Sequence, residues 1–138
     1  MTPKEQCEVL LGTLLPFTED QIKKHREFHP LAAVMLMDGS IEMTGSYDGN
    51  EHPKSEDVLQ TLRQIHKQLA SDGTIKASGI VWDGFVVPAA GKPSDAILVS
   101  LEHKDGYSVI VGEFYKFGLF KKVSFGDLFA LEGKHDIF

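Results

Sequence analysis

The strongest constraint on the fold is residues 95–117, "DAILVSLEHKDGYSVIVGEFYKF", in which alternating apolar side chains flank one tight turn. Asp105-Gly106 favours a two-residue type I′ turn, because glycine and aspartate tolerate the positive φ angles that this turn needs. Such a turn pairs Lys104 with Tyr107 and thereby fixes which side chains share a face. The apolar face predicted in this way consists of Ile97, Val99, Leu101, Ile110 and Phe114. We therefore expect a β-hairpin with one buried side.

Two further Asp-Gly pairs lie in β-rich stretches. In residues 31–47, Asp38-Gly39 predicts a second two-residue hairpin, with Met37 paired to Ser40. Residues 74–88 are longer than a typical strand, so Asp83-Gly84 either turns a hairpin or forms a bulge that bends one strand. Only three apolar residues separate this pair from the next proline, which is short for a returning strand, so the bulge is our preferred interpretation.

Helical spacing marks both the N-terminus and the middle of the chain. Thr2 and Glu5 form a capping-box pattern, and the helix that follows is expected to end at Pro16. A second short helix is predicted to stop near Phe28, because a proline two residues later disfavours helical backbone before it. Ser55 is predicted to cap a longer helix that ends at Asp72-Gly73. Its apolar stripe consists of Val58, Leu62, Ile65 and Leu69.

Near the C-terminus we expect a short strand at 119–123 and a short helix at 125–131 that Ser124 caps. Together these elements predict a single α+β domain over residues 1–138, with an N-terminal helical segment at 1–28 and a core at 29–138. The core is predicted to be one antiparallel sheet of five or six strands, a hairpin meander with helices packed on it. The element order, α-(α)-ββ-α-ββββ-α, resembles that of profilin-like and roadblock-like domains, in order only.

Composition excludes several classes of function. The net charge of −6 argues against nucleic-acid binding, which depends on clustered basic residues. Cys7 is the one cysteine, so no intramolecular disulfide can form, and a reducing, cytoplasmic location is expected. The apolar run at residues 9–17 is about half the ~20 residues that a membrane span needs, so no membrane partner is expected.

The loop at residues 47–53, "YDGNEHP", concentrates the oxygen and nitrogen ligands of the chain. It precedes the predicted helix that starts at Ser55, whose N-terminal N–H groups favour an anion. If the chain binds a small ligand, we expect it at Tyr47, Asp48, Glu51 and His52; the alternative is a solvated turn.

Other candidate residues are weaker. His25 and His29 have the i, i+4 spacing of paired metal ligands on a helix, but Pro30 is expected to remove His29 from that helix. Glu102 and His103 are successive strand residues, so their side chains point to opposite faces and cannot act as an acid–base pair. His103 is predicted to lie opposite Ser108 without an acid to orient it.

Tyr115 and Phe117 are predicted to lie on the face opposite Phe114, which therefore needs a second cover. That cover is either the N-terminal helical segment or a neighbouring subunit. We therefore treat a homodimer as one of two alternatives, with Tyr115 and Phe117 at its interface.

Four stretches in this order and spacing resemble a family of small bacterial proteins of unknown function, over roughly residues 28 to 138. Its most specific parts are the "YDGxExP" loop at 47–53 and the "DAIxxSLEHxDG" hairpin that begins at Asp95. In related sequences the region around Trp82 to Pro88 resembles a single strand, which supports the bulge. The resemblance implies no activity and no catalytic residues.

These observations favour a non-catalytic binding or protein-interaction module over an enzyme. No cofactor is expected, and the partner is a protein, a small molecule or a second copy of the chain. The alternative is a metal-dependent or hydrolytic enzyme that uses Asp48, Glu51 and His52. An interaction module predicts no turnover, whereas this enzyme predicts a stoichiometric metal ion.

Overall fold

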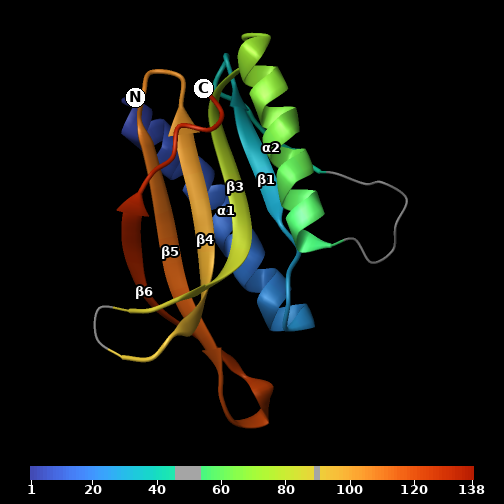
Figure 1. Cartoon of the computed structure of the whole chain (residues 1–138), viewed down its shortest axis with the longest axis vertical. Helices are drawn as coiled ribbons and strands as arrows, with labels where there is room; N and C mark the ends of the chain where they lie inside the picture. The colour runs from blue at the N-terminus through green and yellow to red at the C-terminus, as the bar shows by residue number, and fades with distance from the viewer. Residues whose placement is uncertain (46–53, 89–90) are drawn as a thin grey trace.

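The computed structural model describes residues 1–45, 54–88 and 91–138. Its sheet has six antiparallel strands in the order β2-β1-β3-β4-β5-β6, so the predicted α+β class with a single open antiparallel sheet is confirmed (Figure 1). The elements in chain order are α1 (Pro3–His25), β1 (Leu31–Leu36), β2 (Ile41–Thr44), α2 (Ser55–Ser71), β3 (Ile75–Val86), β4 (Ser94–His103), β5 (Ser108–Phe117), the 3-10 turn η1 (Leu119–Lys121) and β6 (Val123–Glu132).

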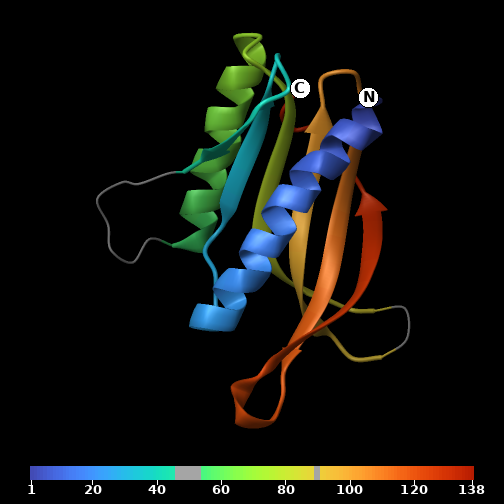
Figure 2. The same ribbon diagram turned by 180° about the vertical axis from the view of Figure 1, so that it is seen from behind.

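Helices α1 and α2 cover opposite faces of the sheet, as Figures 1 and 2 show. Helix α1 packs on β3, β4 and β1, and its buried residues join a core with Ile97, Val99 and Leu101 of β4. Helix α2 packs on β3 and β1 from the other side, where Leu62 meets Ile80. The N-terminal segment therefore covers a face of its own sheet. Of the two covers that the sequence allowed, this segment or a neighbouring subunit, the structure has the first.

Helix α1 continues through Pro16, so the predicted break into two helices is wrong. The capping box at Thr2 and Glu5 is present, and the helix ends at His25 with Arg26 in the left-handed conformation. Pro16 is exposed, and Gly12 stands four residues before it, where a proline ring crowds the preceding turn. The residues that α1 buries lie on both sides of the proline and are Cys7, Leu10, Leu14, Thr18 and Ile22. Burial of this stripe outweighs the local cost of the proline.

Replacing Pro16 by Ala should stabilise the fold by about 1–3 kcal/mol, because alanine restores a helical N–H and removes the ring from the helix interior. Chemical denaturation of both proteins measures the difference. Gly12→Ala is the matched control for helix propensity alone, with an expected gain of about 1 kcal/mol. A P16A variant no more stable than wild type would contradict this account of α1.

Both predicted hairpins at Asp-Gly pairs are present, but each loop is one residue longer than predicted. In the β4–β5 turn, the His103 N–H donates to the Tyr107 carbonyl at 2.8 Å, and Gly106 has a φ of 99°. In the β1–β2 turn, the Leu36 N–H donates to the Ser40 carbonyl at 2.8 Å, and Gly39 has a φ of 93°. Each loop therefore has three residues and ends in a left-handed glycine, where the prediction had two-residue type I′ turns.

This change of one residue moves side chains to the other face of the sheet. In the β4–β5 pair, Leu101 lies opposite Val109 rather than Ile110. Ile110 and Phe114 consequently join Ala96 and Leu98 on the α2 side, and do not share the face of Ile97 as predicted. In the β1–β2 pair, the predicted pairing is shifted in the same way, and Met35 lies opposite Ile41.

Strand β3 runs without interruption through Asp83-Gly84, so neither the preferred bulge nor the alternative hairpin is present. Its pairing with β4 keeps one register from Ala77 to Val86. A Cβ at Gly84 would lie 2.4 Å from Cδ1 of Leu98, so this glycine makes room for a core side chain. Asp-Gly marks a close contact between strands here, not a turn.

The C-terminal prediction of a short strand and a capped helix is also wrong. Residues 119–121 form η1, and the predicted helix at 125–131 is instead part of β6. A bulge shifts the β5–β6 register between Glu113 and Tyr115. Across this bulge, apolar residues three positions apart lie on one face of β6, and that spacing resembles the spacing in a helix. At the start of α2, Lys54 occupies the cap position and its side chain makes no capping hydrogen bond, whereas the predicted cap, Ser55, is the first helical residue.

Candidate functional site

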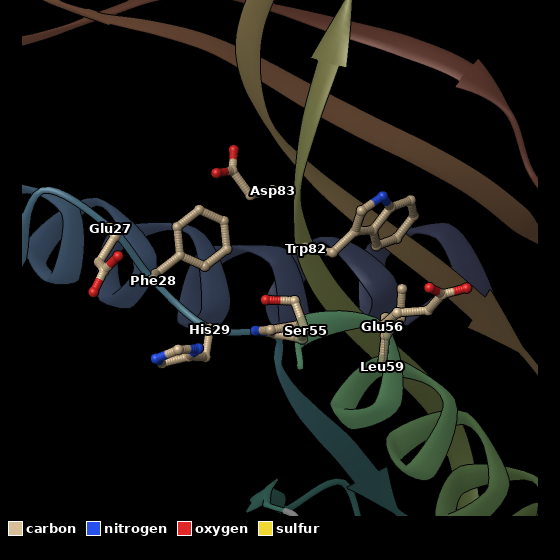
Figure 3. A pocket seen from close by; sticks show the side chains of 9 residues that line it. Glu27, Phe28, His29, Ser55, Glu56, Leu59, Trp82 and Asp83 are labelled. Atoms are coloured by element: carbon tan, nitrogen blue, oxygen red, sulfur yellow. The ribbon is translucent and has the colours of Figure 1, made fainter. Parts of the chain in front are cut away.

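A surface pocket of about 410 Å³ lies between the end of α1, the start of α2 and β3. We call it the helix-end pocket; it is lined by Glu27, Phe28, His29, Pro30, Ser55, Glu56, Leu59, Trp82 and Asp83. Figure 3 shows Phe28, Trp82 and Asp83 around the opening, with the first turn of α2 beside them. The volume falls in the range of small-molecule sites.

The ionisable side chains of the helix-end pocket are accessible to solvent. Glu27, His29, Glu56 and Asp83 are all exposed. Burial raises the pKa of Asp83, while the hydroxyl of Tyr115, which donates to Oδ1 of Asp83 at 2.8 Å, lowers it. Three carboxylates favour a cation over an anion here. The pocket thus combines exposed carboxylates with Asp83, whose pKa burial raises.

The sequence-predicted ligands are not brought together by the described residues. Tyr47, Asp48, Glu51 and His52 lie outside the residues that the structure describes. His25 is the last residue of α1, whereas His29 lies beyond it and lines the helix-end pocket. Within residues 1–45, 54–88 and 91–138, no group of three or more His, Cys, Asp or Glu side chains has the geometry to hold a metal ion.

Glu102 and His103 point to opposite faces of β4. Oε1 of Glu102 accepts from the N–H of Ile137 at 3.2 Å, and burial raises the pKa of this carboxyl. His103 Nε2 lies 2.6 Å from Oε1 of Gln6 in α1, and its Nδ1 accepts from the N–H of Asp105. Ser108 donates instead to the carbonyl of Lys134, so no Ser–His contact forms. These groups fasten the chain ends to the sheet.

A histidine that the sequence reasoning missed lies between α2 and the sheet. His66 is fully buried, and its ring nitrogens lie 2.6 Å from Oγ of Ser78 and 2.7 Å from Oγ1 of Thr44. Burial lowers the pKa of His66 to about 4, so the ring is neutral near pH 7. Val58, Leu62 and His66 follow one another at intervals of four residues, and this spacing is the signal that could have placed His66 in the buried stripe.

The His66 group is not a catalytic triad. Ser78 is 1% exposed, so a substrate cannot reach its hydroxyl. Both ring nitrogens contact neutral hydroxyls, and no carboxylate of the described residues hydrogen-bonds to the ring. The arrangement satisfies buried polar atoms and holds α2 against β3 and β2.

A second missed group is a carboxyl pair beneath α1. Glu113 of β5 is 7% exposed and hydrogen-bonds with Glu19 of α1. Burial, this hydrogen bond and the nearby charge of Glu19 raise the pKa of Glu113 to about 8. Oε1 of Glu113 has no partner among the residues that the structure describes. No sequence signal links two residues so far apart in the chain.

Strand β6 forms one edge of the sheet, so its outer backbone groups pair with no strand of the described chain. Leu128 is 55% exposed and lies opposite Glu113 on the α1 face, whereas Leu131 is 43% exposed and lies opposite Ile110 on the other face. Next to β6, an apolar groove of about 610 Å³ runs under α1. We call this strand with its two exposed leucines the β6 edge.

The two predicted interface residues have different environments. Tyr115 is 5% exposed because α1 covers it within the same chain, so it is not available to a second subunit. Phe117 is 38% exposed, and its ring contacts that of Tyr115 edge-on. Of the two, only Phe117 lies on the surface.

None of the helices in the described part of the chain is long and apolar enough to cross a membrane. Comparison with known proteins gives no match to any family model, curated protein or solved structure. The resemblance to a small bacterial family therefore stays a prediction, and the function has to be argued from the geometry.

Proposed function

We propose that this chain is a non-catalytic protein-interaction module that self-associates through the β6 edge. The observation that carries the proposal is the edge itself, a strand of ten residues with exposed leucines on both of its faces. An exposed sheet edge templates pairing with another strand, and natural sheets usually protect such edges with charge, proline or a bulge. Strand β6 contains no lysine, arginine or proline; its charged residues are Asp127 and Glu132, and one bulge shifts its register with β5.

Charge favours a second copy of this chain as the partner. Lys121 and Lys122 precede β6, and Glu132 ends it. When two β6 strands pair antiparallel, the lysines of one copy lie near Glu132 of the other at both ends of the new ladder. The dimer would continue one sheet across both copies, and the exposed leucines would pack against their counterparts.

The chemistry of the other groups fits a binding role. The Ser78–His66 contact is buried and inaccessible to substrates, and the carboxylates of the helix-end pocket are exposed to solvent. The alternative, a metal-dependent or hydrolytic enzyme, depends on Asp48, Glu51 and His52, which lie outside the described residues. It therefore remains a sequence-based hypothesis.

The proposal predicts a dimer that charge on the β6 edge disrupts. Wild-type protein should sediment at twice the 15.3 kDa chain mass. Leu128→Lys with Leu131→Lys should raise the dissociation constant about a hundredfold or more, because pairing would bury four lysines on the two faces of the joined sheet. Analytical ultracentrifugation over a dilution series measures both constants.

The matched control is Met43→Lys on β2, the opposite edge of the sheet, where the methionine is 48% exposed. This variant should remain dimeric. A wild-type protein that stays monomeric at every concentration rules the proposal out. A dimer that M43K dissociates and the β6 variant does not would place the interface at β2 instead.

A further inference from the structure

The β5–β6 hairpin ends in a projecting apolar tip, visible at the lower end of the molecule in Figures 1 and 2. We define the tip as residues 116–122, "KFGLFKK". Leu119 is 87% exposed and Phe120 is 99% exposed. Full exposure of two large apolar side chains at one point has no role in the folding of the chain itself.

The charged residues within the tip are all lysines. Lys116 begins it, Lys121 and Lys122 end it, and no acidic residue lies between Glu113 and Asp127 in the sequence. The chain as a whole carries a net charge of −6, so this local excess of lysine stands against the general composition. The tip therefore combines apolar side chains at its end with cations at its base.

The backbone of the tip is held in an uncommon conformation. Phe120 and Lys121 both lie in the left-handed region, with φ angles of 60° and 59°. Hydrogen bonds close the turn, because the Gly118 N–H donates to the Lys122 carbonyl at 2.8 Å and the Lys121 N–H donates to the Gly118 carbonyl at 3.1 Å. A bulky residue rarely adopts this conformation, and strain of this kind gathers at functional positions. The turn thus points Phe120 away from the fold at a cost in backbone conformational free energy.

We propose that this tip docks the protein peripherally on an anionic lipid surface, contrary to the expectation of no membrane partner, which rested on the lack of a spanning segment. Leu119 and Phe120 would enter the boundary between headgroups and acyl chains, and the three lysines would contact the lipid phosphates and carboxylates. An acidic protein could also attract the lysines, but it would need a cavity shaped for a convex tip, whereas a bilayer deforms around one. The convex shape and the basic base favour the lipid surface.

The contact is peripheral and does not require the proposed dimer. Antiparallel pairing of two β6 strands would place the two tips at opposite ends of the joined sheet, so one flat surface meets only one tip. Two inserted side chains and three lysines predict weak, reversible binding. Each copy therefore docks alone, and loss of the dimer leaves lipid binding in place.

The test is flotation of the full chain with phosphatidylcholine vesicles that contain about one third phosphatidylserine. Wild-type protein should float with these vesicles and not with pure phosphatidylcholine. Leu119→Ser with Phe120→Ser should lower the partition coefficient about tenfold or more. Lys121→Gln with Lys122→Gln should lower it about tenfold at low salt and by less at high salt.

Met37→Ser is the matched control, since Met37 is 50% exposed at the β1–β2 turn, at the other end of the sheet. It should bind vesicles as wild type does, and circular dichroism should show every variant folded. If wild-type protein does not float with anionic vesicles, the tip is a protein contact and the proposal is overturned. Equal flotation of wild type and the Leu119/Phe120 variant overturns it as well.

Discussion

Replacing Leu14 by Ala should lower the free energy of unfolding by about 3–5 kcal/mol, a large share of the stability of a domain this size. Leu14 is fully buried between α1 and the sheet. Its Cδ1 points at Gly79 of β3, where an added Cβ would lie only 2.6 Å away. The glycine provides the space that the leucine fills, so truncation leaves a cavity lined by backbone that cannot collapse.

Gly79→Ala tests the same contact from the other side. In the wild-type background the new methyl group collides with Leu14, which should cost about 1–2 kcal/mol. In the Leu14→Ala background the collision is gone, and the methyl partly fills the cavity. There the same change should stabilise the fold by about 0.5–1 kcal/mol, since alanine suits a strand better than glycine.

A double-mutant cycle from urea unfolding measures the coupling between the two positions. We expect the two losses to be non-additive by at least about 1 kcal/mol. Gly84→Ala is the comparison, because its close neighbour is Leu98 and not Leu14. If the losses in unfolding free energy at positions 14 and 79 are additive, Leu14 does not pack against Gly79.

The sequence predicts the elements of the sheet better than their register. Asp105-Gly106 and Asp38-Gly39 do turn hairpins, but each needs only its glycine in a positive φ conformation. A two-residue and a three-residue loop share this requirement, so the dipeptide does not distinguish them. The choice depends on which register buries the better face, and that is decided by α1 across the sheet.

At Pro16 and at residues 125–131, tertiary packing likewise outweighs local sequence preference. Pro16 is a strong local signal, yet the buried stripe of α1 extends past it. The stretch at 125–131 has helix-like spacing, yet β5 offers it a full strand partner. Local signals therefore located the elements well where no larger apolar surface competed with them.

The buried polar groups were beyond prediction for a different reason. Glu19 and Glu113 lie on separate elements, and only the docking of α1 brings them together. His66 was within reach, because its spacing from Leu62 continues the stripe of α2. A buried histidine nevertheless contradicts the usual expectation for a polar residue on a helix.

The stability of the protein should depend on pH through these two buried groups, with opposite signs. His66 has a pKa of about 4 in the fold against an ordinary 6.5, so the unfolded chain binds more protons between these values. Its contribution is complete above pH 6.5 and is lost as the pH falls toward 4, by about 2–3 kcal/mol. Glu113 has a pKa of about 8 against an ordinary 4.5, so here the folded chain binds more protons. Its contribution is complete below pH 4.5 and is lost as the pH rises toward 8, by about 1–3 kcal/mol.

The two windows overlap between pH 4.5 and 6.5, where the slopes cancel, so wild-type stability should be nearly level there and fall from pH 6.5 to 8. Burial also raises the pKa values of Glu102 and Asp83 and lowers that of His103, which adds further contributions of both signs. Urea midpoints from pH 4 to 9 measure the profile.

Single variants separate the two contributions. Glu113→Gln keeps a hydrogen-bond donor toward Glu19 and cannot ionise, so the fall above pH 6.5 should disappear and a loss of stability below pH 6.5 should emerge. His66→Gln keeps polar contact with its hydroxyl neighbours, so stability should instead decline steadily from pH 4.5 to 8. The slopes decide the outcome and not the absolute stabilities, because each substitution also changes packing. An E113Q profile parallel to that of wild type above pH 6.5 would show that the Glu113 carboxyl is ionised in the fold, and that α1 accommodates two negative charges beneath it.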